Sequence, residues 1–133
     1  MVCHHVVYDV AALTAFAQAL DRHAARRVVL ELPARHPLAN LAPFWKQFWD
    51  LDRPDGPTSD DCLAVLREAG IDAHADVWDD DWSARRVLTP EEHASFTRIR
   101  LCLPEDREPE VAAALAEASD PGPRRTATVW WDR

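Results

Sequence analysis

Polar side chains that can bind a charged group or move a proton gather at the ends of two apolar runs in this chain. They are Cys3, His4, His5 and Tyr8 at and after the first run, and Glu31, Arg35 and His36 at and after the second. Imidazole is the side chain best suited to proton transfer near neutral pH. If both runs are strands of one sheet, their carboxyl ends lie where α/β proteins bind ligands. We therefore expect these two segments to form one site.

The same residues also have plainer interpretations. In an extended strand His4 and His5 point to opposite faces, so at most one of them can face a bound ligand directly. The two histidines could instead only cap the sheet, and residues 31–36 could be a solvated loop with an ordinary ion pair. We expect no metal at Cys3 and its neighbours, because adjacent residues cannot easily converge on one ion. A general-base role for His36 depends on geometry that a sequence does not show.

Alternating strand and helix signals predict one α/β domain over residues 1–133, with a mostly parallel sheet and helices on both of its faces. Strands are predicted at Val2–His5, Arg27–Leu32, Ile71–Trp78 and Thr126–Trp131. The run Arg27–Leu32 is apolar and β-branched and is stopped by Pro33, as in a strand buried on both faces. Apolar residues recur at three and four over Leu13–Ala24, which predicts a helix with Asp9 as its N-cap.

Further helices are predicted by an aromatic stripe and by two capping boxes. The apolar residues from Leu38 to Trp49 fall on one helix face, and we expect this face to cover the sheet. Thr58 with Asp61 starts one helix, and the segment Thr89–Glu92 starts another.

Composition excludes several classes of partner. The chain is 47% hydrophobic and 29% charged, which is typical of a folded domain, and its net charge of -8 disfavours binding to nucleic acid. We expect no membrane partner and a cytoplasmic protein, because the chain has neither an apolar run of roughly 20 residues nor a signal-peptide pattern. The three glycines are isolated, so the chain contains no glycine-rich phosphate-binding loop.

Four segments resemble class I S-adenosylmethionine-dependent methyltransferases, particularly actinobacterial enzymes that act on small molecules. Val2–Val10, with the sequence VCHHVVYDV, is similar to the fourth strand and following loop of that fold. Arg27–Pro37 is similar to the fifth strand and its loop, and Val129–Trp131 to the closing strand. The stretch from Leu51 to Thr58 and the helix after it, which ends at Gly70, is similar to the family too. The resemblance implies a partial Rossmann-like sheet in which the closing strand is antiparallel and lies between the second and third strands predicted here.

The resemblance also implies roles for the strand-end residues. It assigns Cys3, His4 and His5 to binding of S-adenosyl-L-methionine, and Tyr8, Glu31, Arg35 and His36 to binding of a small-molecule substrate. In this family a methyl group passes from the sulfonium to a nucleophile by in-line displacement, and much of the catalysis is proximity and orientation. No residue is assigned as catalytic.

The glycine-rich half of that family has no counterpart in this chain. Both the acidic, glycine-rich loop after the family's first strand and the acidic residue that holds the cofactor ribose are missing. We therefore expect the truncated C-terminal half of a methyltransferase, which is inactive and binds the cofactor poorly without the other half. The alternative is a non-catalytic α/β binding or protein-interaction module derived from such an enzyme. In either case an unpaired first strand favours a homodimer through that edge.

Overall fold

A computed structural model of the chain describes residues 1–79, 88–119, 122 and 124–133. The chain divides into two compact units. The sheet unit comprises Met1–Pro37, Asp55–Asp80 and Pro123–Arg133, and the helical unit comprises Leu38–Pro54 and Asp81–Gly122. All the residues predicted to form the site belong to the sheet unit.

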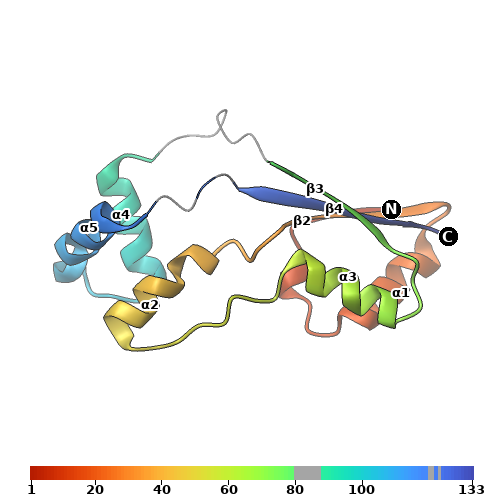
Figure 1. Ribbon diagram of the computed structural model, residues 1–133, viewed down its shortest axis with the longest axis horizontal. Helices are drawn as coiled ribbons and strands as arrows, with labels where there is room; N and C mark the ends of the chain where they lie inside the picture. The colour runs from red at the N-terminus through yellow and green to blue at the C-terminus, as the bar shows by residue number, and fades with distance from the viewer. Residues whose placement is uncertain (80–87, 120–121, 123) are drawn as a thin grey trace. The chain divides into compact units, whose positions relative to one another are not determined.

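The sheet unit contains a four-stranded mixed sheet with the order β1-β2-β4-β3. Figure 1 labels β2, β4 and β3 of this sheet. The strands are β1 (Val2–His4), β2 (Arg27–Pro33), β3 (His74–Asp79) and β4 (Arg125–Asp132). β4 is antiparallel to both neighbours and lies between β2 and β3, which confirms the predicted order. The other three strands run in one direction, so the carboxyl ends of β1 and β2 lie at the same end of the sheet.

The sheet was predicted to be mostly parallel, but most of its strand pairings are antiparallel. Only β1 and β2 pair in parallel, whereas β4 pairs antiparallel with both β2 and β3. One antiparallel strand in an inner position makes both of its pairings antiparallel, although three of the four strands share a direction. β3 also begins later than predicted, at His74, because the N–H of Ala73 donates to the Ile71 carbonyl at 2.8 Å in a tight turn.

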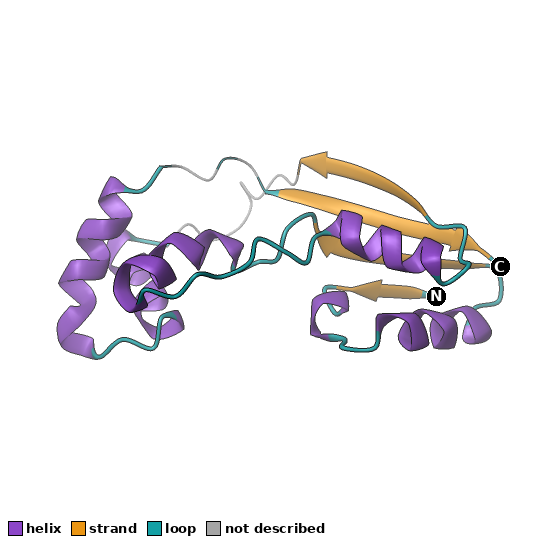
Figure 2. Cartoon of the chain, turned by 60° about the horizontal axis from the view of Figure 1, so that its bottom comes forward, coloured by secondary structure: helices purple, strands orange, loops and turns teal. Residues whose placement is uncertain are grey.

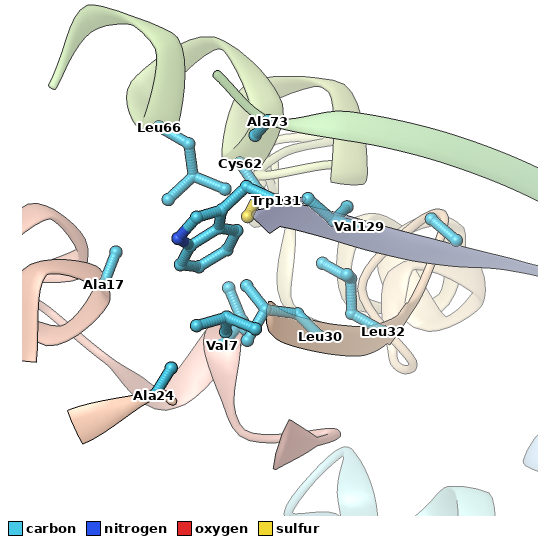
Figure 3. Close-up of a cluster of buried hydrophobic side chains, with 12 residues drawn as sticks. Val7, Ala17, Ala24, Leu30, Leu32, Cys62, Leu66, Ala73, Val129 and Trp131 are labelled. Atoms are coloured by element: carbon cyan, nitrogen blue, oxygen red, sulfur yellow. The ribbon is translucent and has the colours of Figure 1, made fainter. Parts of the chain in front are cut away.

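Both helices of the sheet unit, α1 (Leu13–His23) and α3 (Ser59–Glu68), pack against the same face of the sheet (Figures 1 and 2). Alternate strand residues form the core beneath them, as the two-residue period of a strand requires. These residues are Val28, Leu30, Leu32, Ala127, Val129 and Trp131 (Figure 3). The prediction of helices on both faces is therefore wrong within this unit, where residues of the opposite face such as Val2 stay exposed.

Capping boxes start two helices at the predicted residues. The N–H of Asp61 donates to Thr58 Oγ1 at 3.2 Å, and the N–H of Thr58 donates to Asp61 Oδ2 at 2.7 Å. Thr89 and Glu92 form the same reciprocal pair at the start of the second helix. Both pairs join residues only three apart, which is why the sequence predicted them.

The start of α1 differs from the prediction. Asp9 is not an N-cap but ends the short 3₁₀ helix Val7–Asp9, and α1 begins at Leu13. Val7 is 5% exposed and belongs to the core. The chain therefore turns to bury this side chain before the longer helix begins.

The helical unit has a hydrophobic core of its own. Its helices are α2 (Ala42–Trp49), α4 (Pro90–Arg100) and α5 (Glu108–Glu117), with 3₁₀ turns at Ala39–Leu41 and Glu105–Arg107. Phe44 of α2 is buried there, and Trp45 and Phe48 pack around it with Leu101 and Val111. The prediction that this aromatic stripe covers the sheet is wrong, because periodicity shows that a face is buried but not which partner buries it. Among the described residues of either unit, no helix is long and apolar enough to span a membrane.

Candidate functional site

Three predicted site residues, His4, His5 and Glu31, form a histidine–glutamate cluster where β1 and β2 end. His4 lies opposite Glu31 in the parallel register, and the N–H of His5 donates to the Glu31 carbonyl at 2.8 Å. Glu31 Oε1 lies 3.2 Å from His4 Nδ1 and 3.8 Å from His5 Nε2. The side chains of His4, His5 and Glu31 are 55%, 46% and 30% exposed, so a ligand can reach them.

The backbone of His5 explains how both imidazoles reach one carboxylate. β1 ends at His4, one residue earlier than predicted, and His5 has a φ of 55°. This left-handed conformation is unfavourable for most residues with a side chain, although histidine adopts it more often than most. The turn removes the alternation of an extended strand. The expectation that only one of the two histidines can face the site therefore fails here.

Cys3 is separated from the cluster by the alternation of β1. It lies opposite Leu30 and packs against the hydrophobic core, so its side chain is on the other face of the sheet from His4. Cys62 lies in the same core, where burial raises the pKa of its thiol to about 11. This pKa disfavours the reactive thiolate at neutral pH. The structure thus brings the two histidines to Glu31 without Cys3.

Tyr8 joins the loop after β1 to the end of β2. Its hydroxyl donates a hydrogen bond to the Pro33 carbonyl at 2.7 Å, and its ring packs edge to face with His36 at a centroid distance of 5.3 Å. Burial raises the pKa of Tyr8 to about 12, and the ionisable groups in the first turn of α3 contribute further. Tyr8 is therefore a protonated hydrogen-bond donor at neutral pH and not a base.

The raised pKa of Tyr8 predicts an alkaline titration that can be followed directly, because the chain has a single tyrosine. By phenolate absorbance we expect a midpoint at about 12 in the folded chain and about 10 in urea. The folded state favours the neutral phenol, so stability should decrease as the pH rises above about 10, where the unfolded chain ionises first. Identical titration curves with and without urea would contradict this prediction.

The loop that follows β2 is held by backbone hydrogen bonds. The N–H of Ala34 donates to the Arg125 carbonyl at 2.8 Å, and the Ala34 carbonyl accepts from the N–H of Ser59 at 3.0 Å.

Arg35 Nη2 lies 2.8 Å from Asp55 Oδ1 in an ion pair whose side chains are both well exposed. Exposed pairs of this kind contribute little to stability. Arg35 can therefore exchange Asp55 for an anionic group of a ligand at small cost.

A further set of polar and aromatic side chains, the Trp130 group, lies on the sheet face opposite α1 and α3, and our sequence reasoning missed it. The Trp130 ring stacks on His74 with centroids 4.6 Å apart, and the Arg27 guanidinium carbon lies 4.4 Å from the same ring. Arg27 also forms two hydrogen bonds with Asp132, at 2.6 and 2.8 Å. The sequence signal that could have revealed this group is the alternation of side chains along a strand, which places the adjacent Trp130 and Trp131 on opposite faces.

The chemistry that the histidine–glutamate cluster supports is proton transfer. Imidazole can donate or accept a proton near neutral pH, and Glu31 Oε1 lies within ion-pair distance of both rings. Arg35 and the protonated Tyr8 are further groups that can hold a polar ligand. Within the described ranges, no group of three or more histidines, cysteines or acidic residues is arranged to hold a metal ion.

Comparison with known proteins identifies no family for this chain. Neither a protein-family model nor a curated protein matches it. The features of this chain that bear on its function are therefore the order of its strands and the residues at the strand ends.

Proposed function

We propose that this chain is the C-terminal portion of an S-adenosyl-L-methionine-dependent methyltransferase that acts on a small molecule. The observation that supports this most strongly is the position of β4, antiparallel and inserted between β2 and β3. The resemblance of Val2–Val10 and Arg27–Pro37 to that family implies this strand order. The order is informative because consecutive strands are usually neighbours, whereas here the last strand separates two earlier ones.

The polar residues at the strand ends also support the proposal. His4 and Glu31 lie at the carboxyl ends of two adjacent parallel strands, which is the usual ligand position in α/β proteins. Tyr8 and His36 contact each other in the two loops that follow these strands. In this proposal the histidine–glutamate cluster borders the transferred methyl group, and the loop after β2 borders the methyl acceptor.

The described residues do not fit S-adenosylmethionine on their own. The family's glycine-rich loop allows the backbone to approach the cofactor closely. At Gly70 and Gly122 an added Cβ would meet no atom within 4 Å, and at Gly56 it would meet the Asp61 carboxylate at 3.5 Å. None of these glycines forms a tight cradle. We therefore assign binding of the nucleotide part of the cofactor to the glycine-rich half of a methyltransferase, which this chain does not contain. We assign no residue of this chain to the methyl-transfer step itself.

The alternative function is a non-catalytic α/β module that binds another protein. The Trp130 group favours this alternative, because aromatic residues and arginine are enriched in protein interfaces. This group lies on the sheet face that the helices of its own unit leave open.

The proposal is tested by measuring S-adenosylmethionine binding to two chains by calorimetry. We expect no micromolar binding to the 133-residue chain, because the glycine-rich loop is missing. The second chain is extended by translating the DNA directly upstream of the Met1 codon, with any frameshift corrected. We expect that DNA to encode an acidic-x-Gly-x-Gly segment and the extended chain to bind the cofactor.

The matched control is the extended chain with valine in place of the second glycine of that segment, and it should lose binding. Micromolar binding of S-adenosylmethionine by the 133-residue chain would contradict our assignment of cofactor binding to the glycine-rich half. An unrelated gene upstream, or an extended chain that does not bind, would favour the interaction module.

A further inference from the structure

The sheet face opposite α1 and α3, which we call the open face, carries two carboxylates in one row across the strands. Thr128 of β4 pairs with Glu31 of β2 on one side and with Asp76 of β3 on the other. The Cα atoms of the two acidic residues are therefore separated by two inter-strand spacings, or roughly 10 Å. Only the short side chain of Thr128 lies between them in this row. We call these three residues the acidic row.

Two tryptophans of the open face flank the acidic row. Trp130 lies two positions after Thr128 in β4, and its Nε1 donates to Asp76 Oδ2 at 3.5 Å. Trp78 lies two positions after Asp76 in β3, and its Nε1 donates to Thr128 Oγ1 at 3.2 Å. Because β3 and β4 are antiparallel, the two indoles lie on opposite sides of the row. Trp78 is 42% exposed, so a ligand at the row can also reach an aromatic ring.

The charge of the open face favours a cationic ligand. Arg27 on this face forms two hydrogen bonds with Asp132, so these two charges are paired. Asp76 and Glu31 differ from Asp132, because among the residues that the structure describes no lysine or arginine pairs with either of them. The whole chain has a net charge of -8, which also attracts cations at longer range.

Arg27 shows how this face holds a guanidinium group. The guanidinium carbon lies 4.4 Å from the centre of the Trp130 ring, while two of its nitrogens bond to Asp132 at 2.6 and 2.8 Å. An indole ring and a carboxylate together therefore hold an arginine side chain here. Trp78 and Asp76 offer the same two kinds of group two positions apart on β3.

We propose that the open face binds a basic segment of another protein, whose arginine side chains pair with Asp76 and Glu31 and stack on Trp78. We expect arginine in preference to lysine, because its planar guanidinium can bond to a carboxylate and stack on an aromatic ring. A second copy of this chain does not fit the face, since it would bring carboxylates against carboxylates. The inference goes beyond methyl transfer and does not rest on it, because it requires neither cofactor nor glycine-rich half.

An NMR titration of the 133-residue chain with an acetylated, amidated tetra-arginine peptide tests this inference. The control peptide contains four citrullines, which keep the shape of arginine without its charge. At low ionic strength and about pH 8.5, above the ordinary titration range of histidine, we expect only the arginine peptide to bind, and more weakly as salt is added. The indole N–H signal of Trp78 should shift, whereas that of Trp131, which is buried on the other face, should not. Equal binding of both peptides, or an unchanged Trp78 signal, would overturn the proposal.

Variants separate binding at the acidic row from general attraction to an acidic chain. We expect Asp76→Asn to weaken peptide binding about threefold, and the double variant Glu31→Gln with Asp76→Asn about tenfold. Glu117→Gln is the matched control, because it removes the same charge from an exposed side chain of the helical unit, and it should bind like wild type. Equal losses in Asp76→Asn and Glu117→Gln would show that only the net charge matters and would overturn the proposal.

Light scattering of the same variants tests the other possible occupant of the open face. We expect Asp76→Asn to leave the oligomeric state of the chain unchanged, because this face binds a basic partner and not a second copy. Dissociation of the chain by Asp76→Asn but not by Glu117→Gln would place a second copy on the open face and overturn the proposal.

Discussion

Replacing Trp131 with alanine is expected to lower the free energy of unfolding by about 3–5 kcal/mol. The Trp131 side chain is 2% exposed, and its ring lies among Leu66, Ala17 and Leu30 in the core of the sheet unit (Figure 3). Its Nε1 also donates to Asp21 Oδ1 at 3.1 Å, so the substitution removes a hydrogen bond as well as the largest side chain of this core. Typical domains are stable by only about 5–15 kcal/mol, so the variant should be close to unfolding.

Urea denaturation followed by circular dichroism measures this loss without relying on tryptophan fluorescence. Trp130→Ala is the matched control, because it removes the same type of side chain from the residue directly before Trp131 in β4. Trp130 is half-buried and lies on the opposite face of the sheet. There we expect a loss of about 1–2 kcal/mol, from the contacts with His74 and Arg27. Equal losses in the two variants would mean that Trp131 is not at the centre of the core.

Self-association through β1 is the second large effect that we expect. We propose that the chain forms dimers or larger assemblies, because β1 is an edge strand that pairs, among the described strands, with β2 alone. The N–H of His5 and the carbonyl of Met1 bond to β2, so the backbone groups of Val2 and His4 face away from it. Val2 is also 60% exposed. Free backbone groups beside an apolar side chain favour pairing with another chain.

Light scattering over a range of concentrations measures this association. Val2→Lys places a charge on the edge and should shift the chain towards monomer. Val77→Lys is the matched control, because Val77 lies on β3 at the opposite edge of the sheet and is 38% exposed. A monodisperse wild-type monomer, or equal dissociation by both substitutions, would show that β1 is not the interface.

The features that the sequence predicted are those that depend on near neighbours. The capping pairs Thr58–Asp61 and Thr89–Glu92 each join residues three apart, so their pattern is complete within one turn. The strand Arg27–Pro33 and the helix Leu13–His23 follow from periodicity over a few residues. The strand order also agreed with expectation, but that expectation depended on the order of the elements along the chain together with the family resemblance, and not on any pattern of near neighbours.

The meeting of His4 with Glu31 was predictable for a related reason. Each residue lies at the end of its strand, and the carboxyl ends of neighbouring parallel strands coincide. The contact of His5 with the same carboxylate was not predictable, because it depends on β1 ending one residue earlier and on a left-handed φ at His5.

Only the tertiary structure decided which partners bury each apolar face. The aromatic residues of α2 have a clear helical period, yet their partners Leu101 and Val111 lie more than fifty residues further along the chain. Trp130 and Trp131 are adjacent and identical in type, but the register of β4 places one beside His74 and the other in the core. Local propensities act over a few residues, whereas register and packing partners are selected by the free energy of the whole arrangement. For this reason the sequence determined where most helices and strands form, and the tertiary structure determined which side chains meet.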